Sequence, residues 1–182
     1  MKYSETALLQ AVQIVLRMPA DQRGAAYKNH ECEIEADEMA KATVGDLYVA
    51  IMPGGRRPGP RHNTSAGVFD LVYGVDILVV ARTSNVPRDR YAETVAALNA
   101  EADRILGAID FDFTYLVNQT ANELIEKKTG STEGFVEPLK FTGCDAKPRP
   151  ANPELFGANG AAQSGLVRKM SFHGARRITT RV

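Results

Sequence analysis

Residues 68–82 read VFDLVYGVDILVVAR, and every odd position from 69 to 81 holds an apolar side chain. Successive side chains of a β-strand point to opposite faces, so this pattern predicts one long strand with a wholly apolar face. The even positions begin with Asp70 and end with Leu78 and Val80, which predicts that the far half of the strand is covered on both faces. At roughly 3.3 Å per residue the strand reaches about 45 Å, so part of it is expected to project as a hairpin arm.

The segments around this strand predict a mixture of helices and strands. Apolar residues recur at helical spacing over 4–18 and 88–106, which predicts two amphipathic helices. Alternation predicts further strands at 47–52, 111–117 and 166–172, the last followed by a turn at Gly174 and a short run over 178–182. A short helix is predicted at 121–128, with Thr120 and Glu123 as a capping box.

Together these elements predict an α+β fold: a mixed or antiparallel sheet, two amphipathic helices packed on one face, and a projecting hairpin or loop arm. A length of 182 residues suits a single domain spanning 1–182, with an extended surface segment at about 144–165.

Two basic segments stand out although the formal net charge is zero. Residues 53–66 and 164–182 contain no Asp or Glu, so the rest of the chain is acidic in balance. Such asymmetry favours contact with a complementary acidic surface, on a neighbouring copy or on a nucleic acid backbone. The candidate interface residues in these segments are Arg56, Arg57, Arg61, Arg168, Lys169, Arg176, Arg177 and Arg181.

No catalytic or cofactor motif can be recognised. The run from Gly54 to Arg61 is rich in glycine and arginine but lacks the phosphate-loop spacing, and an Arg-bearing arm fits it better. The aspartates at 70, 76, 110 and 112 could bind a divalent cation, yet the wet face of a sheet explains them more simply. His62, His173, Ser65 and Ser171 lie near arginines without a nucleophile turn. We therefore expect no enzyme activity, no metal and no cofactor.

Membrane and secretion signals are not evident either. The strongly apolar stretch at 68–81 is interrupted by two aspartates, and the N-terminus lacks the uninterrupted apolar core of a signal peptide. We expect an intracellular protein with no membrane partner.

The order of elements resembles the tail terminator, or tail completion, proteins of long-tailed bacteriophages. The resemblance covers mainly 4–18 and 47–117, including Val-Val-Ala-Arg at 79–82 and Ala-Ala-Leu-Asn-Ala-Glu-Ala-Asp-Arg-Ile-Leu at 96–106. It implies a virion subunit, assembled in the host cytoplasm, that forms a hexameric ring. The ring would cap the tail tube and join it to the head connector, so the implied partners are further copies, the tail tube protein and a connector or stopper protein.

Under this resemblance, Arg56, Arg57 and Arg61 could bridge to the acidic body of a neighbouring subunit. The C-terminal basic residues could face the next ring or line a channel through which DNA passes. The acidic segment at 20–45 and the excursion over 118–165 depart from the family layout. Two alternatives stay open: a head-completion or connector protein of the neck, and a small nucleic-acid-binding module.

Overall fold

The computed structural model describes residues 2–17, 26–29, 47–59, 67–83, 86–109, 115–151 and 164–179. The described helices are α1 (Lys2–Arg17), α3 (Arg88–Gly107) and α4 (Leu116–Thr129). The described strands are β1 (Ala26–Asn29), β2 (Leu47–Pro58), β3 (Val68–Arg82), β4 (Lys140–Cys144), β5 (Arg149–Pro150) and β6 (Gly165–Thr179). None of the described helices is long and apolar enough to cross a membrane.

The strands form one six-stranded sheet in the order β1-β2-β3-β6-β4, with β5 also paired to β6. All pairings are antiparallel except that of β1 with β2. The predicted long strand is β3, which pairs with β6 from Val68–Thr179 to Arg82–Gly165. The predicted α+β class, with helices on one face of a mixed sheet, is confirmed.

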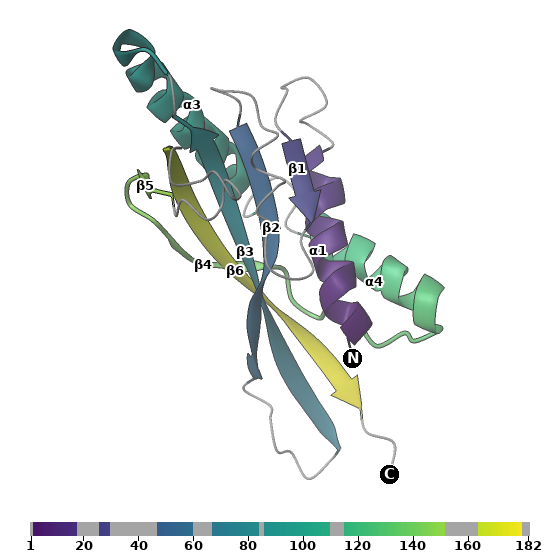
Figure 1. The fold of residues 1–182 in the computed structure, drawn as a ribbon. Coiled ribbons are helices and arrows are strands. Elements are labelled where there is room, and N and C mark those ends of the chain that lie inside the picture. The colour runs from purple at the N-terminus through teal and green to yellow at the C-terminus, as the bar shows by residue number, and fades with distance from the viewer. Residues whose placement is uncertain are drawn as a thin grey trace.

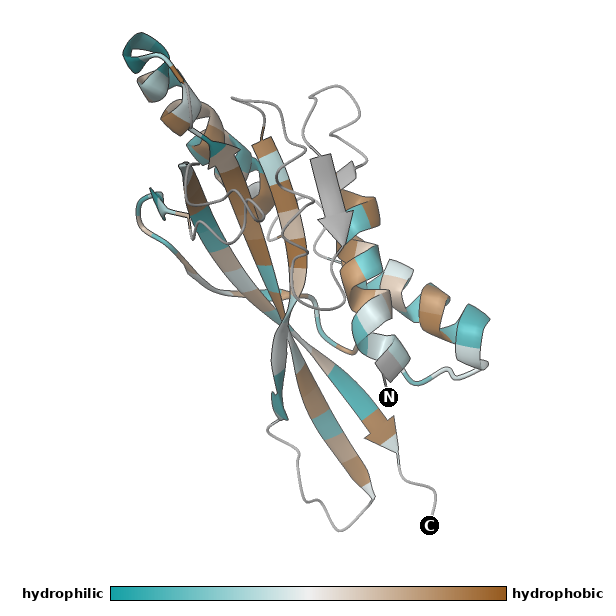
Figure 2. Ribbon diagram, viewed as in Figure 1, coloured by the Kyte–Doolittle hydropathy of each residue, from teal (hydrophilic) through white to brown (hydrophobic). Residues whose placement is uncertain are grey.

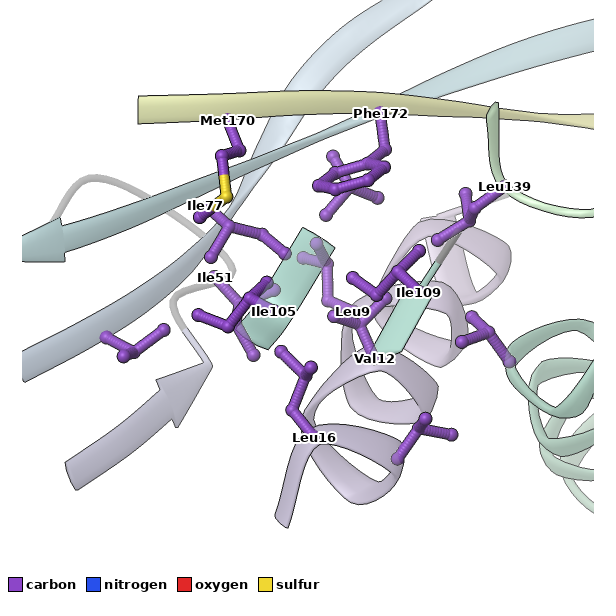
Figure 3. Packing of buried hydrophobic residues seen from close by; sticks show 14 of the residues in the cluster. Leu9, Val12, Leu16, Ile51, Ile77, Ile105, Ile109, Leu139, Met170 and Phe172 are labelled. Carbon is purple, nitrogen blue, oxygen red and sulfur yellow. The ribbon is translucent and has the colours of Figure 1, made fainter. Parts of the chain in front are cut away.

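The main core lies between the sheet and the helices, on the face that we call the helix face. It contains the odd-numbered residues of β3 from Tyr73 to Ala81, with Leu71 packed against them, and apolar side chains of α1, α3 and α4. Figure 3 shows Leu9, Val12 and Leu16 of α1 directed toward Ile51 and Ile77 of the sheet, with Met170 and Phe172 of β6 above them. The periodic pattern therefore faces the core as predicted over 71–81.

The opposite face of the sheet, which we call the far face, has a smaller core of its own. Ala50, Val80, Ala151 and Val167 are buried there together with Tyr48. Since Ala151 follows β5, the segment after β4 covers this part of the far face. The prediction that the second half of β3 is covered on both sides is confirmed.

The ends of β2, β3 and β6, residues 53–58, 68–75 and 172–179, form a three-stranded arm. Its base contacts α1, and its outer part extends beyond the helices (Figure 1). The sequence predicts a long loop or an extended arm over 53–66. Residues 53–58 are part of an arm, because they continue β2 against β3, and 60–66 lie outside the described residues. Among the described strands, β1 pairs with β2 only along 48–51, so Pro53 and Pro58 have no described strand on that side, where a proline is tolerated because no amide donor is needed.

The arm begins at a β-bulge. Pro53 pairs with Val75 and Arg56 with Tyr73, so Gly54 and Gly55 lie opposite the single residue Gly74. A bulge increases the local twist of a strand. In Figure 1 the strands twist at this point, between the part of the sheet that the helices cover and the arm. Gly55 has a φ of 89°, in the region that favours glycine.

Two other predictions are corrected. Tyr115, Leu116 and Val117 belong to the start of α4 and not to a strand, because the buried residues Val117, Ala121 and Ile125 share one helical face. Thr120 lies within this helix, so the capping box is also wrong. The remainder of the predicted strand, 111–114, lies outside the described residues.

β6 runs without interruption through Gly174, where a turn was predicted. Gly174 faces the core, and a Cβ atom built there would lie 3.0 Å from Leu139 Cδ2 and 3.4 Å from Phe135 Cδ1. The glycine therefore serves a close side-chain approach and does not mark a chain reversal.

Candidate interaction site: the basic arm and a pocket at its base

The structure brings the two basic segments of the sequence together. The end of β2 pairs with one edge of β3, and the end of β6 pairs with the other edge. Arg56 and Arg57 therefore lie on the same arm as Arg176 and Arg177, more than one hundred positions away in the sequence. Arg61 and Arg181 lie outside the described residues.

Three of the candidate residues point to the helix face and are used within the subunit. Arg168 donates to Asn99 Oδ1 at 3.1 Å and pairs with Asp103 at 3.3 Å, both on α3. Arg176 is buried and donates to Ser4 Oγ of α1 and, at 3.1 Å, to the Glu133 carbonyl oxygen.

Arg56 is the third, and it pairs with Glu5 of α1, while its guanidinium carbon lies 5.5 Å from the centre of the Tyr73 ring. The hydrogen bond that Arg56 donates to Glu5 raises the pKa of the arginine. These three arginines attach α1 and α3 to the sheet. Arg168 and Arg176 are largely covered by these contacts, whereas Arg56 remains exposed.

The other three described candidates point to the far face. Lys169 Nζ lies 2.7 Å from Asp76 Oδ2, and Arg177 Nε lies 3.1 Å from Asp70 Oδ1. Arg57 is opposite Val72 in the register, which places its side chain on the far face as well. Among the residues that the structure describes, Arg57 forms no ion pair.

A pocket of about 380 Å³ opens on the far face at the base of the arm. Glycines at 54, 55 and 74 line it where the bulge lies, so backbone replaces side chains over part of the wall. Its polar lining includes Arg57, Asp76, Thr142, Lys169, Ser171 and His173. Three of the predicted interface residues, Arg56, Arg57 and Lys169, thus line one concave site.

The polar groups of the pocket are partly connected to one another. Ser171 Oγ donates to Asp76 Oδ1 at 2.7 Å, and Thr142 Oγ1 donates to the Ser171 carbonyl oxygen at 2.9 Å. The serine contacts the aspartate directly and no hydrogen bond links it to His173, so this is not the geometry of a Ser-His-Asp triad. No group of three or more potential metal ligands lies close together in the described parts of the chain.

His173 lines the pocket and has charged side chains around it. Burial lowers its pKa, and the positive charges of Arg57 and Lys140 lower it further, while Glu137 opposes them. Its Nδ1 atom is buried and has no hydrogen-bond partner among the described residues. A neutral imidazole at this position limits the positive charge of the pocket.

The lowered pKa of His173 predicts a loss of stability in acid. The unfolded chain binds the proton more readily than the folded chain, so stability present above the ordinary pKa of 6.5 falls as the pH drops through and below that value. The neighbouring charged groups are Arg57, Lys140, Glu137, Asp76 and Lys169. Urea unfolding of the protein and of His173→Gln, from about pH 8 to about pH 5, should show a steeper decline for the unsubstituted protein. Parallel pH profiles would contradict this assignment.

The alternation of residues along β6 indicates which basic side chains share a face of the sheet, whereas a count of charges in the segment does not. In β6 the core residues Met170 and Phe172 occupy even positions, so Arg168 and Arg176 share their face, while Lys169, His173 and Arg177 share the other. The aspartates at 70 and 76 occupy the matching face of β3 and act as counterions.

No protein-family model matches the chain, and no curated protein matches it in sequence.

Proposed function

We propose that the protein is a structural subunit of a closed, hexameric ring that caps the tail tube of a long-tailed bacteriophage and joins it to the head connector. The main support is the convergence of both basic segments on one projecting arm. A closed ring is built from heterologous contacts, in which one surface of each subunit meets a different surface of the next. An arm with a net positive charge and a remainder of the chain with a net negative charge suit such a contact.

The shape of the subunit adds a second argument. The arm extends beyond the helices at one end, and the first turns of α3 extend beyond the sheet at the other end (Figure 1). Residues 88–93 of α3 are all exposed, including Tyr91 at 46%. Two projections at opposite ends allow neighbouring copies to meet head to tail.

Light scattering of the purified protein over a series of protein and salt concentrations tests this proposal. We expect a single species with six times the mass of the chain, or a monomer that forms such a ring only on the ends of purified tail tubes. A protein that remains monomeric under all these conditions and does not bind tubes would overturn the ring.

The binding partner distinguishes the proposed ring from two alternative functions. A head-completion protein would bind isolated connectors and not tail tubes. A nucleic-acid-binding module would bind DNA as a monomer, with an affinity that falls steeply as salt rises.

A further inference from the structure

The pocket at the base of the arm has the chemistry of a carboxylate site. The charge of Lys169 is balanced by Asp76, whereas that of Arg57 has no counterion among the described residues. A guanidinium binds a carboxylate through two parallel hydrogen bonds, which makes arginine well suited to this ligand. Ser171, Thr142 and the imidazole of His173 supply further polar contacts around the same space.

The size of the pocket limits what can enter it. A volume of about 380 Å³ lies near the small end of the range for ligand pockets, which is about 300–1,000 Å³. One acidic side chain with accompanying water fits this space, while a folded element does not. A side chain carried to the pocket by a projecting element of another copy is therefore a ligand of suitable size.

The free end of α3 carries suitable side chains. Asp89 and Glu93 are exposed and four positions apart, so they share one face of the helix. Neither forms an ion pair with another described residue. The outer end of α3 is strongly hydrophilic in Figure 2, and in the same copy it lies far from the arm and its pocket.

Other exposed acids are less well placed. Glu123 and Glu126 lie on α4, which packs along α1, and Lys127 and Lys128 follow them directly. Because the outer end of α3 extends beyond its own sheet, it can approach the pocket of a neighbouring copy without a steric clash between the two subunits. Glu93 also has a longer side chain than Asp89.

We propose that Glu93 of one copy places its carboxylate in the pocket of the next copy, against Arg57. This contact rests on the proposed ring and defines one of its heterologous interfaces. Asp89, on the same helical face, lies beside the contact and adds to its negative charge.

Charge reversal tests the contact. Arg57→Glu and Glu93→Arg should each weaken association at least about tenfold, since each places like charges together. Both residues are exposed, so the midpoint of thermal unfolding should change little in either variant. Lys147→Glu makes the same charge change at another exposed position and should assemble like the unsubstituted protein.

Mixing the two single variants gives a sharper result. In a ring with alternating subunits, the reversed pocket of the Arg57→Glu variant meets the reversed helix of the Glu93→Arg variant, so opposite charges face each other again. At the next interface, the unsubstituted pocket of the second variant meets the unsubstituted helix of the first. The mixture, and likewise the double variant, should recover most of the association measured by light scattering.

The possible outcomes test the Glu93–Arg57 contact and the ring separately. If the unsubstituted protein assembles but Arg57→Glu assembles equally well, or if the mixture and the double variant do not recover, the Glu93–Arg57 contact is wrong and the ring stands. If the unsubstituted protein never assembles, alone or on tail tubes, both are wrong.

Discussion

Replacing Gly74 with alanine is expected to destabilise the protein by about 1–3 kcal/mol, although alanine is normally the better residue in a strand. A Cβ atom at position 74 would lie 2.6 Å from the Gly54 carbonyl oxygen and 2.8 Å from its carbon. Both are backbone atoms and cannot rotate away as a side chain can. The strands would have to separate at the bulge, which sets the direction of the arm and forms part of the pocket wall.

Gly143→Ala is the matched control for this substitution. Gly143 lies in β4, has no atoms within 4 Å of its would-be Cβ, and does not have a positive φ. Alanine there should be neutral or stabilising by about 0.5–1 kcal/mol. Urea denaturation of both variants gives the comparison, and equal free energies of unfolding would show that the strands tolerate the added methyl group.

The second large effect is expected at Arg176. Arg176→Ala should lower the free energy of unfolding by about 2–4 kcal/mol, because it leaves the Ser4 hydroxyl and the Glu133 carbonyl without their donor and opens a cavity. These contacts join the start of α1 to β6 and to the chain before β4. The arginine is therefore a structural residue of the arm base, although its charge first suggested an interface.

Arg176→Met distinguishes volume from charge. No carboxylate pairs with Arg176 among the described residues, and its Nε has no hydrogen-bond partner there, so the buried charge itself is costly. Methionine keeps much of the volume without that cost, and we expect a clearly smaller loss than with alanine.

Arg149→Ala, which removes an exposed ion pair with Asp145, should change stability by less than about 1 kcal/mol. A methionine variant as unstable as the alanine variant would mean that the two hydrogen bonds of Arg176 outweigh its desolvation.

The sequence predicted the elements with long, regular patterns. The period of two over 69–81 and the helical spacing in α1 and α3 are properties of consecutive residues, so they are visible before folding. It predicted α4 only in part, because Phe111, Phe113 and Tyr115 also alternate like a strand. It misplaced the turn at Gly174, because a glycine that avoids a clash with Leu139 looks the same in sequence as a glycine that turns the chain.

The candidate site could be predicted from the sequence even less completely than the fold. The order of residues along the chain shows which residues are basic, that they cluster in two segments, and that β3 has one apolar face. That both segments flank β3, that Arg56, Arg168 and Arg176 attach helices to the sheet, and that Arg57 and Lys169 line a pocket with Asp76 became visible in the folded structure. The physical reason is that composition and periodicity are local, whereas counterions and register come from strands far apart in the chain. The pairing of β3 with β2 and β6 assigns each arginine to a face and thereby to a role.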